Sequence, residues 1–349
     1  MAEPKSKQVV IVHYHLRLGG VTRVIETAAK ILESDGWKVL VISGEEPEPQ
    51  CSLKHVKVIE ALGYRKTGNS TIAESLTDVL LDTAETFFGA GEILWHFHNT
   101  TLGKNVLMPS VICELAKRGK HLLLQIHDFS EEGRANNYTT QRSYFDYEQT
   151  FQESLYPIAK HIHYAVINER DFEFLKAAGM STSNLHYLPN AVIPLPSTAK
   201  PDPRPFAEER LFVLYPTRGI RRKNIGELLL LAMLWQDEAE FATSLSPVNP
   251  EWQPIYEGWV ALAEELGVKI NFGICDGGRH RFEDALAWAD LMISTSVGEG
   301  FGLAFLEPWT VGKGIVGRRL PDVTKGFRRR GMPLNQLYER LAAEMARLQ

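Results

Sequence analysis

Two glutamates lie within and just after a loop in which glycine occupies every second position. Glu299 lies inside this loop, residues 298–302, and Glu307 follows eight residues later in a segment whose helical periodicity begins near Leu303. Glycine lets the backbone approach a ligand closely, and free N–H groups at a helix start can bind its oxygen atoms. Carboxylates repel a phosphate but accept hydrogen bonds from hydroxyl groups. The pattern therefore predicts a site for a sugar or a ribose.

A group of cations between a predicted strand and a predicted helix gives a second chemical signal. The group consists of Arg218, Arg221, Arg222 and Lys223. Arginine binds phosphate through two parallel N–H donors, whereas lysine acts as a point charge. A charged surface turn is the alternative, in which Arg221 and Arg222 are solvated or paired with acids such as Glu227. Four cations are more than such a turn needs, which favours a phosphate site.

Histidines gather where predicted strands of the first half end. His13 and His15 follow one strand, His96 and His98 close another, and His127 follows a third. Alternate residues of a strand share a face, so the first four should form two same-side pairs. Two interpretations stay open, namely polar residues lining a cleft, or a metal site built from His15, His98, His127 and Asp128. No recognised ligand spacing favours the metal site.

The elements that must position these residues alternate along the first half. An apolar run at residues 9–12 is typical of a buried strand, and a helical pattern follows it. Gly19 and Gly20 lie at this first turn from strand to helix, where backbone N–H groups can face a phosphate. Further strands and helices alternate through residues 161–167. This order predicts an α/β fold with parallel sheets, in which ligands bind at the carboxyl ends of the strands.

Five prolines in residues 193–210 predict a stiff linker between two domains, residues 1–192 and 211–330. In the second domain we expect a helix from Ile225 to about Ala239 and a strand at residues 291–294. Pro308 should kink the helix after the glycine loop or end it early, because its ring clashes with a preceding carbonyl. An amphipathic helix is expected over residues 331–349.

Composition excludes several classes of function. The chain has 349 residues, 44% of them hydrophobic, and a net charge of −5, which suits a globular protein of about two domains. This charge gives no general attraction for nucleic acid. The apolar runs are too short for a transmembrane segment, and no signal-peptide pattern is present. Three distant cysteines indicate neither disulfides nor zinc, so we expect a cytoplasmic protein.

The glutamate spacing resembles the E-x7-E motif of retaining glycosyltransferases of family 4, which have the GT-B fold. Arg218 and Lys223 match the Arg and Lys that this family carries five residues apart. Residues 188–192 are similar to its Pro-Asn-Gly-Val segment, with Ala191 in place of glycine. The resemblance covers about residues 8–317. Beyond it the second domain looks shortened, because further strands and helices would be expected there.

The resemblance implies two Rossmann-like domains that face each other across a cleft. It also implies transfer of a sugar from a nucleotide-sugar, a UDP- or GDP-sugar, to an unidentified acceptor with retention at the anomeric carbon. The residues it assigns to catalysis are His127, Arg218, Lys223 and Glu299. Those it assigns to donor binding are Gly19, Gly20, Arg218, Lys223, Gly300, Phe301, Gly302, Leu303 and Glu307. No Asp-x-Asp motif is present, so we expect neither a metal nor another cofactor.

Two other functions stay open. A dinucleotide-dependent oxidoreductase would need a GxGxxG fingerprint with an acidic partner, which the first glycine turn lacks. A sugar-nucleotide-binding or scaffolding protein would bind the donor and leave it intact. The basic run that ends at Arg330 leaves open a contact with an anionic acceptor or a membrane surface. The apolar face after Leu334 leaves open a homo-oligomer.

Overall fold

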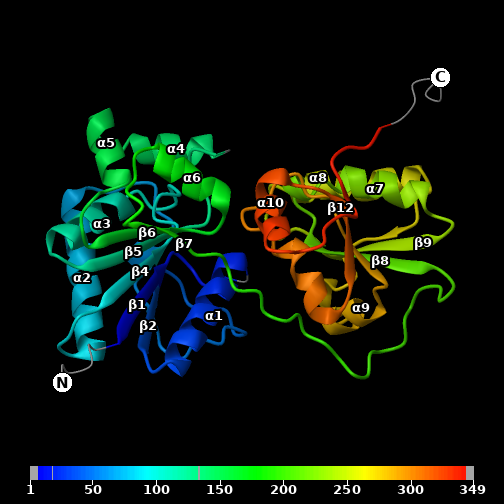
Figure 1. Ribbon diagram of the computed structural model, residues 1–349, viewed down its shortest axis with the longest axis horizontal. Helices are drawn as coiled ribbons and strands as arrows, with labels where there is room; N and C mark the ends of the chain where they lie inside the picture. The colour runs from blue at the N-terminus through cyan, green and yellow to red at the C-terminus, as the bar shows by residue number, and fades with distance from the viewer. Residues whose placement is uncertain (1–6, 18, 133, 343–349) are drawn as a thin grey trace. The chain divides into compact units, whose positions relative to one another are not determined.

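The computed structural model describes residues 7–17, 19–132 and 134–342. The chain forms two compact units, residues 1–191 and 192–349, and each is built on its own parallel sheet (Figure 1). No helix within the described ranges is long and apolar enough to cross a bilayer.

The first unit contains seven parallel strands in the order β3-β2-β1-β4-β5-β6-β7. They are β1 (Gln8–His13), β2 (Lys38–Ser43), β3 (Val56–Val58), β4 (Leu94–His98), β5 (His121–Ile126), β6 (Ile162–Val166) and β7 (Leu185–Tyr187). In β1, Val10 and Val12 belong to one hydrophobic core, whereas Val9 and Ile11 belong to another. The apolar run at residues 9–12 therefore forms a strand that is covered on both faces.

Helices cover both faces of this first sheet. α1 (Gly20–Ser34) packs on one face through Ile25 and Ala29. On the other face lie α2 (Ser70–Phe88), α3 (Met108–Lys117) and α6 (Glu169–Ala177). Two short helices, α4 (Ala135–Arg142) and α5 (Glu148–Leu155), follow β5, and a 3-10 turn, η1 (Glu60–Leu62), follows β3. The Asn69 side chain caps α2 by accepting a hydrogen bond from the N–H of Ile72 at 3.0 Å.

The second unit contains six parallel strands in the order β10-β9-β8-β11-β12-β13. They are β8 (Leu211–Arg218), β9 (Ala239–Leu245), β10 (Ile270–Asn271), β11 (Leu291–Ser294), β12 (Gly314–Arg318) and β13 (Leu337–Tyr338). The chain progresses in opposite directions from β8 and from β11. The carboxyl ends of these two neighbours therefore form a topological switch point, where ligands bind in open α/β sheets.

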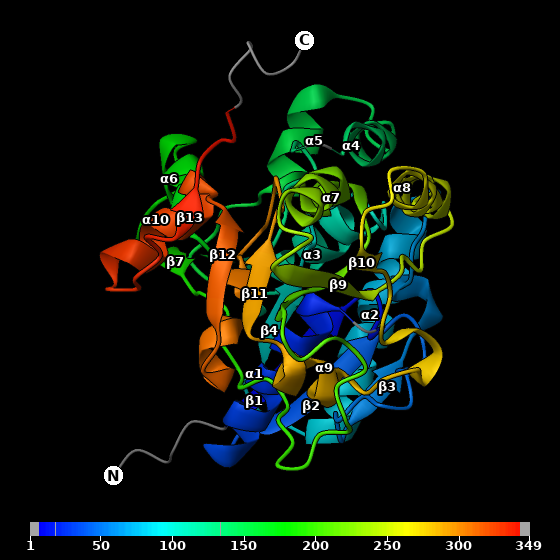
Figure 2. The ribbon, with the colours of Figure 1, turned by 90° about the vertical axis from the view of Figure 1, so that its right-hand side faces the viewer.

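Helices also cover both faces of the second sheet. α7 (Ile225–Leu234) and α8 (Gln253–Glu265) contribute to the core on one face, and α9 (Phe282–Trp288) lies on the other (Figure 2). α10 (Pro321–Arg329) precedes the last strand. Short 3-10 turns occupy loops, namely η2 (Arg221–Lys223), η3 (Asp276–Gly278), η4 (Leu303–Phe305) and η5 (Glu307–Val311).

Two predicted helices of the second unit differ from the structure. The helix from Ile225 ends at Leu234, and strand β9, which we did not predict, begins at Ala239. The segment after the glycine loop forms two 3-10 turns instead of an α-helix, and Glu307 opens the second of them. Pro308 explains this break, since it has no N–H to donate and its ring obstructs the preceding turn.

The predicted C-terminal helix is wrong over the described residues. β13 pairs in parallel with β12, and Leu334 and Leu337 are buried in the unit. The spacing of three and four residues between Leu334, Leu337 and Leu341 imitates a helical stripe, but strand pairing and burial determine the local structure. Residues 343–349, which the same prediction covered, lie outside the described residues.

Candidate functional site

The glycine loop and the cation-rich turn meet at the carboxyl ends of β8 and β11. Lys223 ends η2, the turn after β8, and Glu299 lies in the loop after β11. The ammonium Nζ of Lys223 donates to Oε1 of Glu299 at 2.5 Å, and the side chains are only 13% and 10% exposed. Sequence reasoning assigned each residue to the site separately. The structure joins them in an ion pair that orients both side chains.

Three hydrogen bonds hold the glycine loop against the turn that carries Lys223. Thr295 Oγ1 donates to the Lys223 carbonyl at 2.9 Å, and Ser296 Oγ donates to the Arg222 carbonyl at 3.1 Å. The N–H of Val297 donates to the same Arg222 carbonyl at 2.9 Å. Thr295 and Ser296 are fully buried, so water does not compete for these bonds. Lys223 therefore extends from a fixed backbone.

A network centred on Glu227 supports this turn from the other side. Asn224 follows Lys223 with a left-handed backbone, φ 52°, and its side-chain amide donates to Glu227 at 3.0 Å. Arg318 Nε donates to the same carboxylate at 3.0 Å, and the hydroxyl of Tyr338 donates to it at 2.6 Å. Sequence reasoning missed Arg318 and Tyr338, because no local pattern shows that β12 and β13 reach Glu227.

The other three cations of the turn, Arg218, Arg221 and Arg222, differ in their exposure to solvent. Arg218 is the last residue of β8, not part of the following loop as predicted, and it is half-buried. Arg221 and Arg222 are exposed, as the solvated alternative predicts, whereas Glu227 pairs with Arg318 instead of either. Over the part of the chain that the structure describes, none of these three guanidinium groups forms a hydrogen bond or an ion pair. An anion could therefore bind Arg218 without breaking an existing contact, whereas Arg221 and Arg222 lie in solvent.

α10 packs directly against the glycine loop. Gly302 has a left-handed backbone, φ 89°, and a Cβ there would lie 2.3 Å from Cγ1 of Val323 in α10. The ring of Phe301 packs edge-on against Phe327 of the same helix, with centroids 5.4 Å apart. Leu303 begins η4, directly after this contact. α10 lies beyond the residues that the family resemblance covers, yet it fixes this part of the loop.

The first glycine turn leaves room for a ligand. Gly19 precedes α1, and Gly20 is its first residue. A Cβ at Gly20 would meet no atom within 4 Å, and one at Gly19 would meet only the Arg17 carbonyl at 3.8 Å. Both glycines are exposed at the start of this 15-residue helix, the end at which backbone N–H groups can bind an anion.

Histidines at the carboxyl ends of β1, β4 and β5 form a buried cluster in the first unit. Nδ1 of His98 lies 2.9 Å from Nε2 of His127, and the two rings are stacked with centroids 5.2 Å apart. Nδ1 of His13 donates to the carbonyl of His98 at 3.3 Å. Asn99 fixes the backbone beside them, because its side-chain oxygen accepts from the N–H of His127 at 2.8 Å. His127 is thus held by these neighbours directly after the end of β5.

Burial keeps these imidazoles neutral. Desolvation lowers the pKa of His13 and of His127 to about 3, and it lowers the pKa of His96 to about 4. The pKa of His98 also lies well below its usual range, again mainly through burial. At neutral pH the cluster can exchange hydrogen bonds with a ligand, but it offers no positive charge to a phosphate.

The residues considered for a metal site do not come together as ligands. His15 bonds to the hydroxyl of Tyr64 at 2.9 Å, and Asp128 pairs with Arg134 at 3.2 Å. Across residues 7–17, 19–132 and 134–342, no three His, Cys, Asp or Glu side chains are arranged to hold a metal ion.

Solved structures share this architecture. The chain is similar to HepE of Anabaena in complex with UDP and glucose, with a TM-score of 0.61 and 15% identity over 89% of this chain and 80% of that one. It is also similar to the sucrose-phosphate synthase of Thermosynechococcus elongatus, with a TM-score of 0.59 and 16% identity over 90% and 82% of the two chains. The chain is also similar to WaaG, a glycosyltransferase involved in lipopolysaccharide biosynthesis, with a TM-score of 0.57 and 14% identity over 92% of this chain and 84% of that one. The fold is GT-B.

The GT-B fold confirms the prediction of two Rossmann-like domains. No protein-family model matches the chain. In sequence it is similar to mannosylglucosyl-3-phosphoglycerate synthase of Petrotoga mobilis, with 32% identity over 344 residues and 91% of this chain. The chain spans 66% of that relative's length, just under two thirds. Within the GT-B fold, assignment to family 4 stays a prediction.

Proposed function

We propose that this chain transfers a sugar from a nucleotide-sugar to an acceptor, with retention at the anomeric carbon. The observation that carries the proposal is the contact of Lys223 with Glu299 beside the glycine loop of a GT-B unit. It places a cation suited to a diphosphate next to a carboxylate suited to sugar hydroxyls. The similarity to a synthase whose named product carries sugars supports the same reaction class.

The chemistry requires stabilisation of a departing nucleoside diphosphate. As the bond between the anomeric carbon and the phosphate oxygen breaks, negative charge grows on the diphosphate, and preorganised cations lower the barrier. Lys223 and Arg218 supply these cations. In the structure Glu299 neutralises Lys223. The donor phosphate would take over this contact, leaving Glu299 to accept hydrogen bonds from the sugar.

Further roles follow the family resemblance. Glu307, which is half-buried at the start of η5, would accept hydrogen bonds from the ribose. His127 would donate or accept a hydrogen bond at the sugar as a neutral imidazole, because its pKa is about 3. Neither residue is assigned a nucleophilic attack. The reaction as proposed needs no divalent metal.

The substrates can be proposed more narrowly. The name of the Petrotoga mobilis relative describes a product with mannosyl and glucosyl groups on 3-phosphoglycerate. We therefore propose a mannosyl donor and a glucosylated phosphoglycerate as acceptor for this chain. The nucleotide of the proposed donor is UDP or GDP.

Two measurements test the proposed function. A thermal-shift screen of UDP, GDP, ADP and their sugars should show one nucleotide that raises the melting temperature, because a ligand stabilises the state that binds it. Release of that nucleoside diphosphate should then require the acceptor, and NMR of the product should show the anomeric configuration of the donor. Binding without release or transfer would instead establish a sugar-nucleotide-binding protein. Inversion in the product would refute retention.

A further inference from the structure

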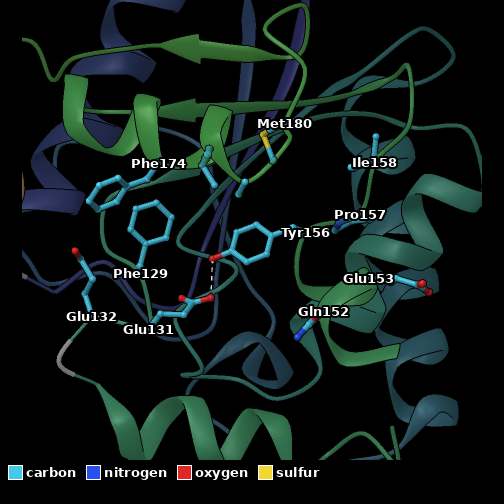
Figure 3. Close-up of a pocket in the computed structure, with 12 residues that line it drawn as sticks. Phe129, Glu131, Glu132, Gln152, Glu153, Tyr156, Pro157, Ile158, Phe174 and Met180 are labelled. Carbon is cyan, nitrogen blue, oxygen red and sulfur yellow. Dashed lines mark hydrogen bonds between the residues drawn. The ribbon is translucent and has the colours of Figure 1, made fainter. Parts of the chain in front are cut away.

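A cavity of about 820 Å³ opens in the first unit between the loop after β5, the end of α5 and the end of α6 (Figure 3). Its volume lies within the range of small-molecule sites. The first lining residue, Phe129, comes only two residues after His127, but the cavity uses none of the residues assigned to the donor. The cavity therefore lies outside the proposed donor site.

The lining is apolar at the floor and at the mouth. Phe129, Leu175 and Met180 are buried and belong to the main core of the unit. Ile158 and Phe174 lie at the mouth and are 79% and 51% exposed. Large apolar side chains at the rim of an apolar cavity favour a ligand with an apolar body, because such a ligand removes their surface from water.

Carboxylates give the cavity a negative charge. Glu131 is exposed at the cavity, and its two oxygens accept hydrogen bonds from the hydroxyls of Tyr156 and Ser130, each at 3.1 Å. Figure 3 shows the Tyr156 bond beside the ring of Phe129. Glu153 accepts only from the amide of Gln149 at 2.8 Å. Among the described residues, neither carboxylate pairs with a cation.

One protein cation, Arg170, lies beside the rim of the cavity. Its guanidinium pairs with Glu132 and with the buried Asp171, each at 2.8 Å, and lies 5.3 Å from the ring centroid of Phe174. Carboxylates and an aromatic face thus hold a cation at one side of the cavity. Glu131, with the rings of Phe129 and Tyr156 nearby, offers the same two elements to a ligand.

We propose that this cavity binds a small organic cation, an ammonium group carried on an apolar body. The ammonium group forms an ion pair with Glu131, and the body lies against Phe129, Tyr156 and Phe174. The sign of the charge excludes phosphorylated ligands, so the site is distinct from those for the donor and for a phosphorylated acceptor. The inference does not depend on the proposed transfer reaction.

Three probes of equal length test the chemistry on the full chain without donor. They are hexylammonium, 1-hexanol and hexanoate, measured by titration calorimetry. Hexylammonium should bind saturably and about tenfold more tightly than hexanol, because a charged hydrogen bond adds to the apolar contact. Hexanoate should not bind. Equal affinities for hexylammonium and hexanol, or no binding of hexylammonium, would overturn the proposal.

Variants locate the site. Glu131→Gln keeps the size of the side chain and removes its charge, so hexylammonium should bind about tenfold more weakly. Glu173→Gln makes the same charge change on α6 outside the lining, where Glu173 pairs with Lys176, and should leave the affinity unchanged. Ala178→Phe should fill the cavity and abolish binding. Equal effects of the two glutamate variants would contradict the assignment.

A last control separates loss of the site from loss of the fold. Melting temperature and nucleotide binding should be unchanged in Glu131→Gln. If that variant unfolds, Tyr156→Phe removes only the hydroxyl that orients Glu131, and it should weaken hexylammonium binding while the core stays filled. Unchanged affinity in Tyr156→Phe would then refute the proposed role of Glu131.

Discussion

Because Lys223 pairs with Glu299, a substitution of Lys223 should change both the rate of transfer and the free energy of unfolding. Lys223→Ala should lower kcat about a hundred- to a thousand-fold if Lys223 stabilises the departing diphosphate. The same change leaves the nearly buried carboxylate of Glu299 without a cation, which should cost roughly 1–3 kcal/mol of unfolding free energy. Urea unfolding and donor kinetics measure the two effects. Arg222→Ala, at an exposed neighbour, is the matched control.

A double variant distinguishes these effects. Lys223→Ala combined with Glu299→Ala removes both charges, so it should regain stability relative to Lys223→Ala alone but no activity. If the losses of stability in the two single variants add up in the double variant, the two side chains do not stabilise each other. Equal, mild losses of kcat in Lys223→Ala and Arg222→Ala would show that the turn is only a diffuse positive surface.

The neutral histidines make the first unit sensitive to acid. The pKa of His13 and of His127 is lowered from an ordinary 6.5 to about 3, so between these values the unfolded chain binds protons that the folded chain does not. The stability that these two neutral imidazoles contribute should be complete above pH 6.5 and should fall as the pH drops toward about 3, by about 1.4 kcal/mol per pH unit for each histidine. Urea unfolding between pH 7 and pH 5 measures this slope.

One substitution tests whether the buried histidines cause this sensitivity to acid. His127→Gln should reduce the dependence of the unfolding free energy on pH by about 1.4 kcal/mol per pH unit, the contribution of one histidine. His55→Gln, at an exposed position, serves as the matched control. A slope that His127→Gln leaves unchanged would show that other groups, such as carboxylates, cause the acid sensitivity.

At the scale of elements, α10 is a support for the glycine loop. Phe327→Leu should weaken donor binding about tenfold, because Phe301 loses the ring against which it packs and the loop must be ordered when the donor binds. The effect should fall on KM more than on kcat, since Phe327 does not touch the reacting atoms. Arg328→Ala, exposed on the same helix, should change neither. A loss confined to kcat would place Phe327 in another role.

The sequence predicts elements well where burial is continuous and poorly where it depends on distant partners. β1 and β11 are apolar runs and were predicted directly. β9 was missed because Thr243 and Ser244 are polar, although both are buried. Their hydroxyls bond to backbone groups, namely the N–H of Gly273 and the carbonyl of Thr217. Such satisfaction of polar groups is a tertiary property that no local pattern encodes.

The candidate site shows the same division. The resemblance of the glycine loop and of the cation-rich turn to the family motifs singled out Lys223 and Glu299. Their contact was not predictable, because 76 residues separate them and only the order of β8 and β11 brings them together. The supports from Arg318 and Tyr338 arise in the region where the family resemblance ends.

For the whole molecule, we predict activity without a metal. The positive charge that stabilises the diphosphate comes from side chains, and no three candidate ligands within the described ranges converge. Transfer should therefore be unchanged in EDTA, and elemental analysis of the purified protein should show no stoichiometric zinc or iron. Loss of activity in EDTA that added Mg²⁺ or Mn²⁺ restores would refute this prediction.

The bond from Tyr338 to Glu227 also sets an order of events during synthesis. Lys223 leaves the ribosome long before Tyr338, which follows it by 115 positions and completes the support of the turn that carries Lys223. At about 5–20 residues per second, this delay lasts roughly 6–23 seconds. During that interval the nascent chain already carries every cation of the turn, but it lacks the last hydrogen bond to Glu227. Competence to bind the donor tightly should therefore arise only after Tyr338 has been synthesised, and a growing chain that ends before Tyr338 should not sequester sugar nucleotide.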